Sequence, residues 1–125
     1  MRYQLELSRS FTARQGLRSP VLAAQGKKPT APVGGFAVVM RVGVLFDESE
    51  LKPTGWFVDT DALDQYLDYC AAHLISDTWT NLFDFRPTFE LVARWAFQKL
   101  LPDVPGLAYV ELENATLGVS TRYTS

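Results

Sequence analysis

The side chains best suited to metal binding or nucleophilic catalysis are scarce in this chain. Cys70 is its only cysteine and His73 its only histidine. One subunit therefore has neither an internal disulfide nor a metal site built from several cysteine and histidine ligands. The surrounding residues have helical periodicity, and a thiol on the apolar stripe of a helix is usually part of the core. We expect Cys70 to be a buried thiol and His73 to be an ordinary histidine near the end of that helix.

Thr88 and Glu113 could contact a ligand, but each also has a simple structural explanation. Thr88 follows a proline and precedes an amphipathic stretch, which makes it a candidate helix N-cap. Glu90 then falls in the first turn of the helix, where the helix dipole favours an acid. Glu113 lies at the end of a predicted strand and could be a charge in solvent. Residue types alone therefore do not identify a site.

The elements that must position these residues follow from the spacing of apolar side chains. In the first half of the chain we predict a strand around residues 3–8, a long loop over 18–35, a strand covered on both faces over 36–46 and a short strand over 56–58. Two helices follow, one with apolar positions from 63 to 74 and one that opens at 87–88 and ends at Pro102. The last predicted elements are strands over 107–113 and 117–123. This order indicates an α+β fold, with an antiparallel sheet and two helices packed on one face.

The composition favours one folded domain over residues 1–125. Hydrophobic residues make up 47% of the chain and aromatic residues 13%, which is too much apolar surface for a disordered chain. The formal net charge of −2 gives little support to nucleic-acid binding, and the basic cluster at Arg14, Arg18, Lys27 and Lys28 is best explained as a solvated loop. No apolar run approaches the length of a membrane span or a secretory signal, so we expect a cytoplasmic protein without a membrane partner.

Four segments, read in order, resemble the 6-pyruvoyltetrahydropterin synthases and the related 6-carboxytetrahydropterin synthases. The first strand ends in SFTARQGL (10–17), which is similar to the family's Phe-Ser-Ala-Ala-His-x-Leu, and the first helix is entered through GWFVDTDAL (55–63), similar to Gly-x-Val-x-Asp-Phe-x-x-Leu. The second helix carries PTFELVARWAFQKL (87–100), which resembles Pro-Thr-x-Glu-Asn-Leu-Ala, and the last strands carry VELENATLGVSTRY (110–123). The resemblance implies the T-fold, in which sheets from several subunits join into a barrel, and a homo-oligomer that we expect to be a hexamer.

The chain departs from this family at the residues that bind the family's catalytic zinc. The first of the three zinc-binding histidines corresponds to Gln15, and the other two fall in residues 31–36, which contain no histidine. The family's catalytic cysteine has no counterpart in the preceding loop, and its Asp-His pair corresponds to Asp77 and Thr78. The resemblance therefore implies a homologue with no metal, no cofactor and no catalytic residues for the synthase reaction.

The chain does resemble the family at the positions that would hold a pterin. A pterin presents an exocyclic amine and a ring N–H side by side, and a carboxylate can accept both hydrogen bonds. Glu113 stands at the position of this anchor, with Glu111 as the reserve candidate. Thr88 and the adjacent backbone at Phe89 match the position that contacts the far side of the ring. These matches imply that a pterin-like ligand binds at subunit interfaces.

Two other functions stay open on the sequence. A metal-independent enzyme acting on a pterin-like substrate would use Arg14, Asp77 or Asp84, and a strongly shifted pKa of either acid inside the pocket would favour it. A scaffold protein that keeps only the fold would have a pocket filled by Phe36 or Trp79.

Overall fold

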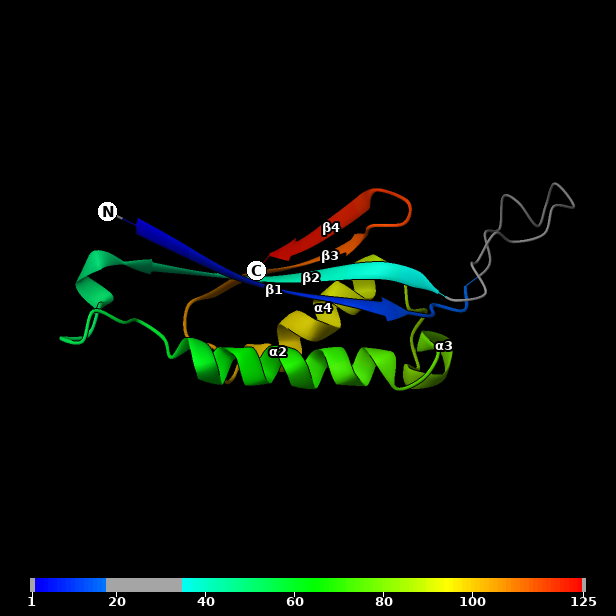
Figure 1. The fold of residues 1–125 in the computed structure, drawn as a ribbon, viewed down its shortest axis with the longest axis horizontal. Coiled ribbons are helices and arrows are strands. Elements are labelled where there is room, and N and C mark those ends of the chain that lie inside the picture. Colours follow the sequence, from blue (N-terminus) through cyan, green and yellow to red (C-terminus); the bar gives the residue numbers. More distant parts are fainter. Residues whose placement is uncertain (1, 18–34, 125) are drawn as a thin grey trace, which may run out of the picture.

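The structure, a computed structural model, describes residues 2–17 and 35–124. One antiparallel sheet contains, in spatial order, β1 (Arg2–Ala13), β2 (Phe36–Asp47), β3 (Leu107–Asn114) and β4 (Val119–Thr124). The helical elements are the short 3-10 turn η1 (Glu48–Glu50), α2 (Thr60–Ile75), the single turn α3 (Trp79–Leu82) and α4 (Phe89–Leu100). Both long helices lie against the same face of the sheet, which confirms the predicted α+β architecture (Figure 1). Most of the predicted loop, residues 18–34, lies outside the described residues.

The core lies between the sheet and the two long helices. Alternate residues of β2 face the helices, and Met40, Val42 and Val44 have 0% exposure there. Trp79 of α3 is also fully buried, and its indole Nε1 donates a hydrogen bond to the Leu74 carbonyl at 3.0 Å. This indole joins the end of α2 to the turn that follows it.

Both long helices begin at a capping side chain, and the one at Thr88 confirms the predicted N-cap. The Asp59 side chain caps α2 by accepting hydrogen bonds from the backbone N–H groups of Asp61 and Ala62. The Thr88 hydroxyl caps α4 by accepting from the Leu91 N–H at 3.2 Å. Capping satisfies N–H groups that have no partner within the helix. Thr88 therefore has a structural role in the place where the sequence also suggested a ligand contact.

The predicted short strand at residues 56–58 is wrong. The Trp56 carbonyl accepts a hydrogen bond from the Lys52 N–H within a tight turn, and the Trp56 side chain is 63% exposed. Phe57 instead stacks its ring on that of Phe46, with 4.6 Å between the centroids. So short a segment would form few ladder hydrogen bonds, and here it leads the chain from the sheet into α2.

The face of the sheet opposite the helices is polar, and no part of residues 2–17 and 35–124 covers it, so the prediction that β2 is covered on both faces holds for one face only. Ala37 is exposed and Val39 only half-buried. Tyr109 is the exception, because its ring lies across Gly43 on the neighbouring strand and is 3% exposed. Its hydroxyl donates to Glu6, and the Arg122 guanidinium lies 3.8 Å from the ring centroid.

Candidate ligand-binding pocket

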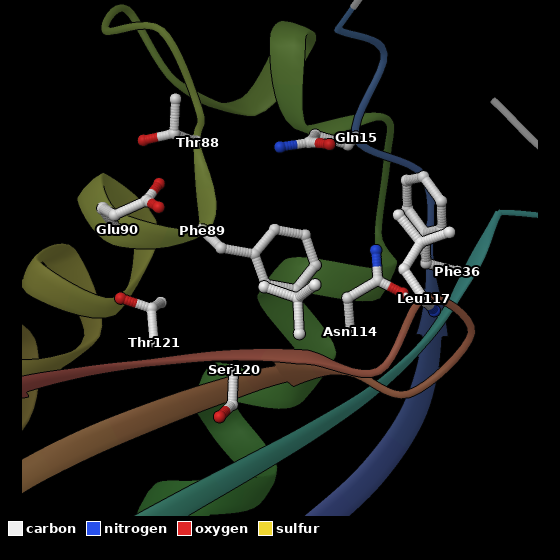
Figure 2. Close-up of a pocket in the computed structure, with 10 residues that line it drawn as sticks. Gln15, Phe36, Thr88, Phe89, Glu90, Asn114, Leu117, Ser120 and Thr121 are labelled. Carbon is white, nitrogen blue, oxygen red and sulfur yellow. Dashed lines mark hydrogen bonds between the residues drawn. The ribbon is translucent and has the colours of Figure 1, made fainter. Parts of the chain in front are cut away.

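A cavity of about 290 Å³ opens beside the N-terminus of α4, between that helix, the end of β1 and the β3–β4 hairpin (Figure 2). This volume lies near the lower end of the range for small-molecule sites, about 300–1,000 Å³. Leu117 and Val119 of the hairpin form an apolar part of the lining, and both are mostly exposed. The lining also includes Gln15, Phe36, Thr88, Phe89, Glu90 and Asn114.

The pocket brings together two of the three predicted ligand-binding residues. Thr88 and Phe89 line it from the first turn of α4, and Figure 2 shows the Phe89 ring in the middle of the group. Glu113 is not part of the lining. Neighbouring residues on a strand point to opposite faces, and Asn114 is the residue that points to the helix side.

On the open face, Glu113 belongs to an ion-pair network. Its Oε1 accepts a hydrogen bond from Arg41 Nη1 at 2.8 Å, and the same nitrogen donates to Glu111 Oε2 at 2.9 Å. Arg122 pairs with the other Glu111 oxygen at 3.2 Å. The hydrogen bond with Glu113, followed by that with Glu111, raises the pKa of Arg41. The two candidate anchors thus lie together, and the sheet separates both from Thr88 and Phe89.

Glu90 is the carboxylate that lines the pocket. It is the second residue of α4, directly after Phe89, and its side chain is directed towards the cavity in Figure 2. The sequence suggested only a first-turn acid at this position. Its place next to Phe89 was visible in the sequence, but its orientation depends on how α4 is seated against the hairpin.

Two amides of the pocket are held by backbone partners. Gln15 Nε2 donates to the Pro87 carbonyl at 2.9 Å, which ties the end of β1 to the start of α4. Asn114 Oδ1 accepts from the Leu117 N–H at 3.1 Å, inside the β3–β4 turn. Asn114 is only 6% exposed. The strand alternation could have found it, because Val110 and Leu112 are two buried residues on the same face of β3.

The acids considered for a metal-independent enzyme do not line the pocket. Asp77 accepts hydrogen bonds from Asn81 and from the Thr78 N–H, and these lower its pKa at an exposed position. Asp84 is exposed as well. Phe36 lines the cavity without filling it, and Trp79 is buried in the core. Within the described residues, neither acid therefore lies inside the pocket, and neither Phe36 nor Trp79 fills it.

The single cysteine and the single histidine also lie away from the pocket. Cys70 is a core thiol, as predicted, with 1% exposure, and burial raises its pKa to about 11. His73 stacks on Trp95 with 5.0 Å between the ring centroids. Across residues 2–17 and 35–124, no three His, Cys, Asp or Glu side chains gather closely enough to hold a metal ion. None of the described helices has both the length and the apolar character needed to cross a membrane.

No protein-family model matches this chain, and no curated protein is similar to it in sequence. Among solved structures, it is similar to the 6-pyruvoyl tetrahydropterin synthase of Caenorhabditis elegans, with a TM-score of 0.74 and 22% sequence identity. The match covers 100% of this chain and 96% of that one. The TM-score demonstrates a common fold, and the low identity leaves the activity open. The chain therefore has the T-fold predicted from its sequence.

Proposed function

We propose that this protein binds a pterin-like bicyclic heterocycle in the pocket at the start of α4, and that it does not perform the zinc-dependent synthase reaction. The observation that carries the proposal is the lining of the cavity, where an aromatic ring and a carboxylate, Phe89 and Glu90, lie side by side. An aromatic face suits a flat ligand, and a carboxylate suits its N–H groups. The full-length likeness to a protein named 6-pyruvoyl tetrahydropterin synthase supports a pterin as the first ligand class to test.

Each side chain of the first turn of α4 has a distinct part in this proposal. The Phe89 ring provides the surface against which the heterocycle stacks. Glu90 accepts a hydrogen bond from the exocyclic amine of the ligand. Thr88 fixes the turn that carries both, because its hydroxyl caps α4. The exposed apolar side chains of Leu117 and Val119 at the hairpin leave room for a second subunit to close the pocket.

Glu90 replaces Glu113 as the proposed carboxylate of the site. A ligand that used both oxygens of Glu113 would compete with Arg41, whose Nη1 holds Oε1 at 2.8 Å. Breaking a charge-assisted pair opposes binding, whereas Glu90 has no ion-pair partner among the described residues. The role first predicted for Glu113 stays a prediction, and the two carboxylates can be tested against each other.

The side chains present do not fit the zinc site and the proton relay of the synthases. The chain's only thiol is buried in the core, and its only imidazole is stacked on Trp95. Neither Cys70 nor His73 lines the pocket, so neither can move a proton of a ligand bound there. We therefore expect no stoichiometric zinc in dialysed protein and no conversion of dihydroneopterin triphosphate. One zinc per subunit, or turnover, would contradict this part of the proposal.

Calorimetric titration of oxidised and reduced pterins tests the binding site. We expect Glu90→Gln to weaken the tightest ligand by roughly tenfold to a hundredfold, which corresponds to a charge-assisted hydrogen bond of about 1.5–3 kcal/mol. Glu113→Gln is the matched control and should change the affinity little. If Glu113→Gln weakens binding and Glu90→Gln does not, the ligand binds on the open face instead. If wild type binds no pterin, the scaffold function is left as the better explanation.

A further inference from the structure

Two amide side chains face the ligand pocket with opposite hydrogen-bonding polarity. Gln15 Nε2 donates to the Pro87 carbonyl at 2.9 Å. A backbone carbonyl can only accept a hydrogen bond, so the nitrogen of this amide must face Pro87. The acceptor end of the amide, Oε1, is thereby assigned. Gln15 is half-buried and lines the pocket.

The second amide, Asn114, is oriented in the opposite sense. Its Oδ1 accepts from the Leu117 N–H at 3.1 Å, and a backbone N–H can only donate. The donor end, Nδ2, therefore points away from the turn, and Figure 2 shows it directed into the cavity. Asn114 is 94% buried, since its exposure is 6%, and no described residue accepts a hydrogen bond from its Nδ2. Among the described residues, this donor is therefore free to bond a group that enters the cavity.

We propose that Gln15 and Asn114 together recognise a lactam edge, which is an N–H group next to a C=O group on a planar heterocycle. The ligand N–H donates to Gln15 Oε1, and the ligand carbonyl accepts from Asn114 Nδ2. This inference rests on the proposed function, and it adds to it the feature by which the pocket selects its ligand. The 2-amino-4-oxopyrimidine ring, shared by pterins and guanine, carries such an edge. On this ring the exocyclic amine lies next to the lactam N–H, so the amine that Glu90 would accept and the lactam that the two amides would contact belong to the same edge of the ligand.

Gln15 and Asn114 can discriminate between a lactam and its amino counterpart, because the two ligands present their hydrogen-bond donor and acceptor in opposite order. When an amine replaces the 4-oxo group, the adjacent ring nitrogen loses its hydrogen. An N–H would then face Asn114 Nδ2, and a lone pair would face Gln15 Oε1. Both contacts become repulsive while the ring keeps its size and shape. Sites built to hydrogen-bond a specific edge reject the mismatched analogue because buried polar groups are left unpaired.

The test is the ratio of dissociation constants for 2,4-diaminopteridine and 2-amino-4-oxopteridine. We expect wild type to bind the oxo compound at least roughly tenfold more tightly. The pair 2,6-diaminopurine and guanine has the same reversal on a purine, and its absolute affinities show whether the natural source of the edge is a pteridine or a purine. Equal binding of oxo and amino compounds in both series overturns this inference and leaves the proposed function standing. Absence of binding for all four compounds overturns both.

Three variants test whether the two amides determine the ratio of dissociation constants. Asn114→Asp keeps the acceptor for the Leu117 N–H and removes the donor, and Gln15→Met keeps the length of the side chain and removes the acceptor. Each should lower the ratio severalfold or reverse it. Thr121→Val, also in the pocket lining, is the control and should change both affinities by the same factor. Folding of each variant is checked by thermal melting. If Asn114→Asp does not fold, wild type and Gln15→Met still decide, and an unchanged ratio in Gln15→Met contradicts the proposal.

Discussion

At the scale of single residues, Tyr109 links the open face of the sheet to the pH dependence of stability. Burial, followed by its hydrogen bond to Glu6, raises the pKa of this phenol from 10.0 to about 12. Between these values the unfolded chain loses the phenolic proton while the folded chain keeps it. The folded state therefore binds more protons, and its stability falls as the pH rises. The expected slope in this window is about −1.4 kcal/mol per pH unit.

Chemical denaturation from pH 9 to pH 11.5 measures this slope. Tyr109→Phe should be less stable than wild type at pH 9, because it loses the hydrogen bonds to Glu6 and Gln4. Above pH 10 the difference should shrink, since the variant has no phenol to ionise. Cys70, whose pKa is also raised, is common to both proteins and cancels in the comparison. Parallel pH curves for the two proteins would contradict the prediction.

Residue types predicted structural roles in this chain better than they predicted ligand contacts. Thr88 was identifiable as an N-cap because capping depends on the local sequence alone. The position of Glu113 depends on which face of β3 packs against the helices. Val110 and Leu112 are buried on that face, so Glu113, which follows Leu112, points to the opposite face. Similarity to a motif assigned Glu113 to the pterin, whereas the strand alternation places its neighbour Asn114 in the pocket.

At the scale of elements, the pairing of β2 with β3 depends on a glycine. The Tyr109 ring crosses Gly43, and a Cβ at that position would clash with the ring. The register of the two strands also shifts between Gly43 and Val44. We expect Gly43→Ala to lower the free energy of unfolding by about 1–3 kcal/mol, because the ring would have to leave its place over Gly43.

A double-mutant cycle separates this clash from any change in strand propensity. In the Tyr109→Ala background the ring is gone, and Gly43→Ala should then cost little or be mildly stabilising. Urea denaturation of the four proteins gives the coupling free energy. An equal cost of Gly43→Ala in both backgrounds would show that the ring does not require the glycine.

The long elements were predictable from the sequence because each buries one face over many residues. β2 and α4 repeat their apolar positions over 12 residues each, which is long enough for strand and helix periods to be told apart. The turn α3 has four residues and η1 has three, and neither repeats its pattern. Residues 56–58 have the apolar composition of a strand, but composition does not provide a neighbouring strand edge to pair with.

At the scale of the whole molecule, the two edges of the sheet indicate assembly. The 12 residues of β1 form one edge and β4 forms the other, so each exposes backbone groups that no strand of the described residues pairs with. Unprotected edges of this length favour pairing with another chain. Leu117 and Val119, next to the β4 edge, are 65% and 62% exposed and also line the ligand pocket. A neighbouring subunit at this edge would cover them and close the pocket.

We therefore predict a closed homo-oligomer, most simply a hexamer, whose formation depends on the β4 edge. Val119→Lys places a charge where the neighbour would pack, so light scattering at micromolar concentration should show smaller species than wild type gives. Ile75→Lys is the matched control, because Ile75 is 51% exposed at the end of α2, the helix that packs against β1 at the opposite edge of the sheet from β4. It should leave the assembly intact. Ligand affinity should fall together with the oligomer in Val119→Lys, because the subunit that covers the edge also closes the pocket. If wild type is a monomer under these conditions, the prediction of a site closed by a second subunit is wrong. If Val119→Lys leaves the oligomer unchanged, the subunits contact each other at another edge.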